Sequence, residues 1–481
     1  MSQVAKGFVW SGIERFSIQG IGFLLSIIIA RIVSPSSYGL IVMIQVFLSF
    51  SQIFIDGGFA NALIQKKDRT EIDYYTVFLF NMAVAMGLYL VFFITAPFIA
   101  DFYDEPQLTL ITRVVALNLI INSLSLIQRA KLTIELDFKT QTKAGLLSVI
   151  ISGIIGIICA YSGLEVWALV VSGLAGAFVT SISLIYFSRW IPRFQFSIVS
   201  FKKMFSYGSK LMANNIITSI YINLANLIIG KKYSAADLAF YNRGFTLSQF
   251  PSTNIAEVMN RIIFPVLTQL QDDRKKLIEA YEKYLHLSNF IILPLMMLLI
   301  VLAQPLIEIL LTDKWTPAVP YIQIYSLNFM LYAVMLQSGN PVAAVGHSGI
   351  LLKYQIIKRA VSFVLLIATV GISIKALCWG VFVSSAFEVA INMYVLKKDI
   401  GVSFRNQIVP QLDVVLSVCL VGVIVYVWTL VIDNAFLQLF VGGLLGLLVY
   451  LTNTFIFSLR EKDLITKLYA NVICRIRSDE R

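Results

Sequence analysis

The chain has 481 residues, of which 58% are hydrophobic and only 14% charged, and its mean hydropathy is +0.81. A soluble domain usually has about 25% charged residues, so this composition excludes an ordinary soluble protein. The net charge of +11 would suit nucleic-acid binding, but the distribution of the basic residues gives another explanation below. The four cysteines are scattered and the two histidines stand alone, so we expect no disulfide, no metal site and no cofactor.

Apolar runs recur along the whole chain, and a run of about 20 residues crosses the roughly 30 Å hydrocarbon core of a bilayer. The pattern predicts an all-α polytopic membrane protein with about 14 transmembrane helices. The first run lacks a small-residue cleavage site, so we interpret it as a retained span. The predicted spans are 8–30, 38–59, 76–98, 110–128, 144–162, 166–187, 207–229, 244–270, 287–311, 319–339, 356–373, 377–396, 413–432 and 436–458.

The basic residues are distributed unevenly between the two sets of loops. Most of the 38 Lys and Arg residues lie on one side of the membrane if the N-terminus is cytoplasmic. The positive-inside rule then predicts that both termini are cytoplasmic. The basic excess belongs to topology and to anionic lipid headgroups, so membrane lipids are expected partners and nucleic acid is not.

The chain contains an internal repeat. The pattern restarts after a long basic connection, and the corners Ser34-Pro35-Ser36 and Ser234-Ala235-Ala236 lie 200 residues apart. Because six spans precede the restart, the two halves form a parallel repeat. The predicted division is an N-lobe at 1–190, a cytoplasmic linker at 191–206, a C-lobe at 207–400, two extra helices at 401–458 and a cytoplasmic tail at 459–481.

Two matching spans of the repeat carry polar stripes. A polar stripe on an apolar helix is either a close helix–helix seam or the wall of a cavity. Arg15 favours a cavity, because a seam would not hold an unpaired guanidinium. The stripes contain Ser11, Arg15, Gln19, Gly22 and Ser26 in the first span, and Asn215, Ser219, Asn223 and Asn226 in the seventh. Two such stripes in two halves predict a central water-filled cavity.

The stretch from 238 to 273 is long enough to cross the bilayer, yet Asn254, Glu257, Asn260 and Arg261 lie in its middle. A central Arg or Asp facing lipid costs about 2.5 to 3.5 kcal/mol, so this helix should face the cavity. Glu257 and Arg261 are four residues apart and share a helix face. The alternative is a buried ion pair that only orients the neighbouring helices.

Four further charged residues leave alternatives open. Asp56, at the end of the second span, either couples an ion or is solvated by headgroups. Arg113 either extends outward to the headgroups or faces a cavity open to the outside. Glu388, near the middle of the twelfth span, carries a proton or cation, or is a protonated carboxyl satisfied by a neighbouring helix. Glu14 adjoins Arg15 in sequence but points elsewhere on the helix.

Three stretches of the sequence carry a family resemblance. They are LAFYNRGFTLSQFPSTNIAEVMNRIIFPVLTQLQDD, AQPLIEILLTDKWTPAVPYIQIYSL, and QRAKLTIELDFKTQTKAGLLSVIISGIIGIICAYSGLEVWALV leading to RWIPRFQF. The chain resembles the Wzx-type polysaccharide flippases, in the colanic acid exporter-like branch of the multidrug/oligosaccharidyl-lipid/polysaccharide (MOP) exporter superfamily.

There is no Walker A sequence, and neither a Ser/His/Asp nor a zinc constellation, so we expect no enzyme activity.

The resemblance implies a MATE-like fold of two six-helix lobes plus two helices, in the bacterial inner membrane, working by alternating access. It implies flipping of undecaprenyl-diphosphate-linked oligosaccharide repeat units to the outer leaflet, for lipopolysaccharide O-antigen, capsule or exopolysaccharide. A polysaccharide polymerase and a chain-length regulator are the expected partners. Since one chain holds both lobes, we expect a monomer.

A diphosphate headgroup needs cations, and Arg binds phosphate in a bidentate manner. We expect Arg15 and Arg261 to bind it, with Arg113 and Arg243 taking over nearer the outer face. The expected polar lining is Gln19, Ser26, Asn215, Asn223, Asn226, Asn254 and Tyr241, and the candidates for ion coupling are Glu14, Asp56, Glu257 and Glu388.

Two other functions remain as alternatives. A multidrug or cation antiporter of the same superfamily would favour a cavity rich in carboxylates and aromatic rings, and the arginines would repel its cationic substrates. A scaffold that recruits glycosyltransferases without transport would not need the arginines at all.

Overall fold

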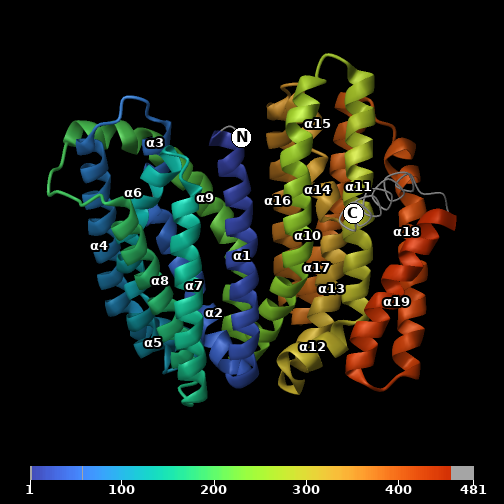
Figure 1. Ribbon diagram of the computed structural model, residues 1–481, viewed down its shortest axis with the longest axis horizontal. Helices are drawn as coiled ribbons and strands as arrows, with labels where there is room; N and C mark the ends of the chain where they lie inside the picture. The colour runs from blue at the N-terminus through green and yellow to red at the C-terminus, as the bar shows by residue number, and fades with distance from the viewer. Residues whose placement is uncertain (1–2, 57, 457–481) are drawn as a thin grey trace, which may run out of the picture. The chain divides into compact units, whose positions relative to one another are not determined.

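The computed structural model describes residues 3–56 and 58–456, without the side chains of residues 3–16, of residue 348 and of several positions between 207 and 221. Within this part of the chain every regular element is a helix (Figure 1). The predicted all-α membrane fold is therefore confirmed. The contacts divide the chain into two units, Met1–Ala239 and Phe240–Arg481.

The first unit is a bundle in which α1, α7, α8, α6 and α4 pack in that order, while α9 packs against α2, α3 and α4. The short α3 lies near one end of the bundle (Figure 1). The helices are α1 (Gln3–Ile32), α2 (Pro35–Asp56), α3 (Phe59–Gln65), α4 (Glu71–Tyr103), α5 (Leu108–Val115), α6 (Leu117–Ile134), α7 (Phe138–Tyr161), α8 (Val166–Ser188) and α9 (Ile198–Lys232).

The second unit begins within α10 (Ala235–Gln269). In it α11 packs against α13 and α18, and α17 packs against α13 and α16. The remaining elements are α11 (Arg274–Val301), α12 (Ala303–Leu311), η1 (Asp313–Ala318), α13 (Val319–Met330), α14 (Tyr332–Gln337), α15 (Asn340–Ala344), α16 (Ser348–Val370), α17 (Ile374–Val395), η2 (Leu396–Ile400), α18 (Phe404–Val431) and α19 (Ala435–Ile456).

Short polar residues start many of these helices, because their side chains accept hydrogen bonds from backbone N–H groups of the first turn. Asp137, Ser197, Asp273, Ser373 and Ser403 do so for α7, α9, α11, α17 and α18. The helix boundaries are therefore set by the sequence at the membrane surfaces, where polar caps are tolerated.

Ten helical segments of the described chain are long and apolar enough to cross a membrane. The other four predicted spans fall on α1, α9, α10 and α16. The apolar stretch 17–32 of α1 is shorter than those ten segments, and α9, α10 and α16 are not among them. The total of 14 spans stays a prediction.

A new helix begins at each corner of the predicted repeat, α2 at Pro35 and α10 at Ala235, and the repeat itself stays a prediction. The linker predicted at 191–206 is helical from Ile198 onward, since that stretch forms the first turns of α9. The whole of α9 belongs to the first unit. The division into lobes at the linker thus differs from the division by contacts, which falls after Ala239.

Close contacts at one end of the first unit hold α9 in place. Gly39 lies so close to the α9–α10 corner that a Cβ atom there would be 1.8 Å from the carbonyl oxygen of Ala235. At the same end Lys231 forms an ion pair of 2.8 Å with Asp104. The carboxylate of Glu165 accepts hydrogen bonds from the backbone and hydroxyl of Ser34. These contacts join the α1–α2 connection to the α7–α8 connection, and the α9–α10 connection to α2 and to the α4–α5 connection.

We predict that Gly39→Ala lowers the free energy of unfolding by at least about 2 kcal/mol, because overpacking displaces backbone atoms here rather than a flexible side chain. The matched control is Gly87→Ala on α4, where an added Cβ meets no atom within 4 Å. Thermal unfolding of the purified protein measures both. Equal unfolding temperatures for the two variants would contradict the close contact.

Candidate functional site

Two helices of the first unit carry polar stripes with the same spacing. On α2 the stripe is Gln45, Ser49, Gln52 and Asp56, and on α6 it is Asn118, Asn122, Ser125 and Arg129. Each stripe follows steps of four, three and four residues, which keep side chains on one helix face. Both stripes end in a charged residue, and the two charges are opposite.

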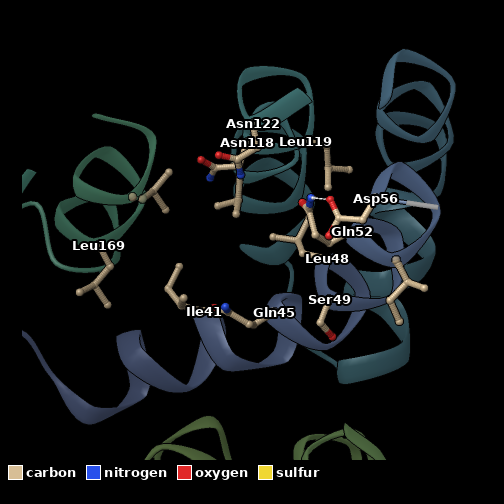
Figure 2. A pocket seen from close by; sticks show the side chains of 14 residues that line it. Ile41, Gln45, Leu48, Ser49, Gln52, Asp56, Asn118, Leu119, Asn122 and Leu169 are labelled. Carbon is tan, nitrogen blue, oxygen red and sulfur yellow. Dashed lines mark hydrogen bonds between the residues drawn. The ribbon is translucent and has the colours of Figure 1, made fainter. Parts of the chain in front are cut away.

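The two stripes line one cavity. Figure 2 shows Gln45, Ser49 and Gln52 on α2 and Asn118 and Asn122 on α6 at its walls. Its volume is about 530 Å³, and α8 closes it with Leu169, Val170 and Gly173. The amide of Gln52 donates a hydrogen bond of 3.0 Å to Asp56 (Figure 2). This volume is typical of a small-molecule site.

The cavity continues past its charged end. A second cavity of about 590 Å³ shares Gln52, Asp56 and Asn122 with the first and adds Arg129 and Asn215. A third, of about 390 Å³, has Arg129 in its wall as well. We call the three together the polar chamber. Asp56 and Arg129 thus both line the second of these cavities.

The side chains of the polar chamber are accessible although they lie on membrane-spanning helices. Gln45, Asp56, Asn122, Arg129 and Asn215 are all exposed. An exposed polar side chain at membrane depth requires water or a polar ligand beside it, because lipid cannot satisfy it. The amide groups both donate and accept hydrogen bonds, as sugar hydroxyls require, and the guanidinium suits phosphate.

Of the predicted site residues in the first unit, Asp56 and Asn215 line the polar chamber. The side chains of Glu14 and Arg15 lie outside the described part of the structure. Gln19 is exposed on α1, while Ser26 donates a hydrogen bond of 2.8 Å to its own helix at Phe23.

The remaining predicted residues of this unit lie apart from the chamber lining. Asn223 donates to the backbone and hydroxyl of Ser219 one turn earlier, and Asn226 is half-buried on α9. The guanidinium carbon of Arg113 lies 4.5 Å from the ring centroid of Phe93, and its Nε donates to the carbonyl of Phe93. Arg113 therefore contacts α4.

In the second unit most of the predicted residues are satisfied locally. The Tyr241 hydroxyl accepts a hydrogen bond of 2.7 Å from Tyr325, and Arg243 lies 5.0 Å from the ring centroid of Trp315. Asn254 donates to the carbonyl of Phe250 one turn earlier. Tyr241 thus joins α10 to α13 and Arg243 joins α10 to η1, while Asn254 bonds within α10.

The charged pair on α10 behaves differently from the expectation. Arg261 is exposed and forms no hydrogen bond or ion pair with any described residue, so it does not neutralise Glu257 in this structure. Glu257 is half-buried and interacts with another group. Arg261 is thus accessible to an anionic ligand.

Glu388 forms an ion pair that the sequence analysis did not foresee. Its carboxylate lies 2.9 Å from the ammonium of Lys358, which also donates to Asn392. The two charged side chains are only 16% and 11% exposed. A neighbouring helix does satisfy Glu388, as one alternative expects, but its partner is the ammonium of Lys358, which neither alternative included, and ion coupling stays a prediction.

Arg129 is the principal residue that the sequence analysis missed. It follows the fourth predicted span by one residue, so it was treated as part of a basic loop. The four-three-four spacing of polar residues from Gln45 to Asp56 and from Asn118 to Arg129 is visible in the sequence, and it would have identified both stripes.

Comparisons with known proteins identify the family. The family described as "Polysaccharide biosynthesis protein" matches residues 28–320. The chain belongs to this family. One relative is the lipopolysaccharide biosynthesis protein WzxC of Escherichia coli, which is 25% identical over 71% of this chain and 69% of the relative. The succinoglycan biosynthesis transport protein ExoT of Rhizobium meliloti is 21% identical over 97% of this chain and 94% of the relative.

Two solved structures share the fold of this chain. The lipid II flippase MurJ in an inward closed conformation covers 95% of this chain and all of its own, with a TM-score of 0.76 at 17% identity. An inward-facing MATE family transporter of the MOP superfamily covers 82% of this chain and 98% of its own, with a TM-score of 0.62 at 16% identity. The resemblance found in the sequence is confirmed.

We predict that the polar chamber contains water. In a variant with all four cysteines replaced by serine, Asn122→Cys should react with a small charged thiol reagent at least roughly tenfold faster than Leu90→Cys, because the reactive thiolate forms in water. Leu90 is 58% exposed on α4 and provides the lipid-facing control. Labelling rates measured in membranes test this, and equally slow labelling at both positions would mean a dry chamber.

We also predict that Lys358 and Glu388 stabilise the protein only as a pair, so that the effect of replacing one depends on the presence of the other. Lys358→Met or Glu388→Gln alone should cost up to about 3 to 5 kcal/mol, because each leaves one charge uncompensated among buried groups. The double variant should be more stable than the less stable of the two single variants. Thermal unfolding of the unaltered protein, the two single variants and the double variant gives a double-mutant cycle. Additive losses would show that the two side chains are energetically independent.

Proposed function

We propose that this protein is a lipid-linked oligosaccharide flippase that serves the assembly of a surface polysaccharide. Its family relatives are named as polysaccharide biosynthesis and transport proteins, and they are transporters rather than enzymes. The proposed substrate is an oligosaccharide repeat unit on undecaprenyl diphosphate. The proposed direction is from the cytoplasmic to the outer leaflet of the bacterial inner membrane, by alternating access.

The observation that carries the proposal is the polar chamber, with neutral amides along its length and Arg129 at one end. A sugar chain presents many hydroxyl groups, and each needs a hydrogen-bond partner once it leaves water. The stripes on α2 and α6 supply amides and hydroxyls at the spacing of a helix face. A transporter of hydrophobic cations would form few favourable contacts with these amides and hydroxyls.

The diphosphate needs cations, and the charged ends of the stripes suggest where one lies. We propose that Arg129 binds the headgroup in the first unit, while Arg261, which is accessible in the second unit, stays a proposed ligand of its own. Arg15 stays a proposed ligand from α1.

We predict that Arg129→Ala lowers export of the surface glycan at least roughly tenfold, with lipid-linked repeat units accumulating inside the cell, because the headgroup loses its charge-assisted hydrogen bonds. Arg15→Ala and Arg261→Ala should act in the same direction. Surface glycan and lipid-linked intermediates are measured in cells whose only copy of the gene is the variant.

The matched control is Lys143→Ala, which removes an exposed positive charge from α7 of the same unit. All variants are compared at equal amounts in the membrane. Normal export in the three arginine variants would contradict the proposal and support a scaffold without transport.

A further inference from the structure

The segment between α8 and α9 is fixed against the first unit at its beginning. We call residues 185–205 the strap, which comprises the end of α8, an irregular stretch and the first turns of α9. Trp190 is 7% exposed, and its indole N–H donates a hydrogen bond of 2.9 Å to Glu71. Its ring stacks on Tyr75 with 5.6 Å between ring centroids. The start of the strap is therefore anchored to α4.

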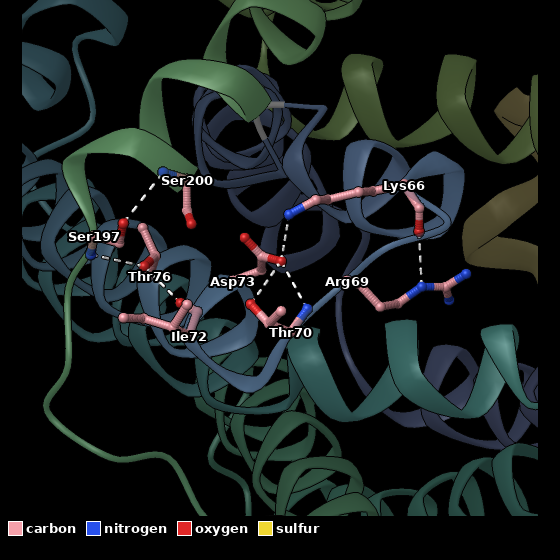
Figure 3. Close-up of polar contacts among 8 residues, drawn as sticks. All are labelled: Lys66, Arg69, Thr70, Ile72, Asp73, Thr76, Ser197 and Ser200. Carbon is pink, nitrogen blue, oxygen red and sulfur yellow. Dashed lines mark hydrogen bonds and ion pairs between the residues drawn. The ribbon is translucent and has the colours of Figure 1, made fainter.

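A second anchor holds the strap where α9 begins. The backbone N–H of Ser197 donates to the hydroxyl of Thr76 at 3.0 Å, and the N–H of Ser200 donates to the hydroxyl of Ser197 (Figure 3). Beside them the buried carboxylate of Asp73 pairs with Lys66 at 2.5 Å (Figure 3). With both ends fixed, the stretch between them presents a defined outer surface.

That outer surface is apolar and basic. Phe194 is 94% exposed, and the other exposed apolar residues are Tyr186, Phe187, Ile191, Phe196, Ile198, Val199 and Phe205. The exposed basic residues are Arg189, Arg193, Lys202 and Lys203. No acidic residue occurs from 185 to 205. Aromatic and aliphatic side chains interleaved with Lys and Arg are typical of segments that lie in the membrane interface.

The position of the strap suits such a segment. It starts where the membrane-spanning α8 ends, at Ser188, so it lies at the boundary of the hydrocarbon core. An open pocket of about 470 Å³ is found there, lined by Ile185, Tyr186, Phe187, Arg189 and Ile191. The pocket thus combines apolar walls with one guanidinium.

We propose that the strap binds an anionic phospholipid of the adjoining leaflet. The acyl chain lies against the apolar walls of the pocket, and the phosphate contacts Arg189, with Arg193 nearby in the chain. The absence of acidic residues makes the surface complementary to a net negative headgroup, which a zwitterionic lipid lacks. This lipid site is separate from the polar chamber and does not rest on flipping activity.

The first test compares lipid nanodiscs of phosphatidylcholine with nanodiscs that also contain phosphatidylglycerol. The unfolding temperature of the unaltered protein should rise with the anionic lipid, and the double variant Arg189→Ala/Arg193→Ala should lose more than half of that rise. The control Lys67→Ala/Lys143→Ala removes the same charge from exposed positions outside the strap and should keep the rise. Equal responses of the two double variants overturn the proposal.

The second test identifies what covers the strap. The photoreactive residue benzoylphenylalanine replaces Phe194 in the full-length protein, which is irradiated in the mixed nanodiscs and analysed by mass spectrometry. An adduct with the mass of phosphatidylglycerol supports the proposal. A cross-link to a peptide from 240–481 would show that the second unit covers the strap, and this outcome overturns the proposal, as does the absence of any lipid adduct.

Discussion

A polar group inside a bilayer must meet water or another polar group, and this requirement explains most of what distinguishes one helix of the protein from another. The protein meets it in three ways. Ser26 and Asn254 bond to carbonyls of their own helices. Lys358 and Glu388 pair across two helices. On the stripes, the hydroxyls of Ser49 and Ser125 also bond to their own helices, whereas Gln45, Asn122 and Arg129 remain accessible at the wall of a cavity.

The second constraint is how closely neighbouring helices can approach one another. The approach of α2 to the α9–α10 corner is possible because position 39 has no side chain. That approach, with the ion pair between Asp104 and Lys231, keeps α9 with the helices that precede it in the chain. The unit boundary therefore falls after the corner, although the linker in the sequence comes before α9.

The fold was predictable because hydropathy, loop charge and family motifs all depend on local sequence. The site was predictable only in part. Asp56 and Asn215, which line the polar chamber, are candidates from the sequence because a polar residue on an apolar span is conspicuous, and their role stays a proposal. Arg129 was missed because a basic residue at the end of a span has the same pattern whether it meets headgroups or a cavity. Lys358 was missed as the partner of Glu388 because pairing between α16 and α17 depends on packing, which the sequence does not display.

The identical spacing of the two stripes has a consequence for movement. With a rise of about 1.5 Å per residue, successive side chains of each stripe stand about 4.5 to 6 Å apart along the helix axis. For the proposed oligosaccharide substrate, this interval places an equivalent polar side chain about 4.5 to 6 Å beyond the previous one on each helix. We therefore expect movement along the two helices to exchange one hydrogen-bond partner for the next, without the loss of all partners together.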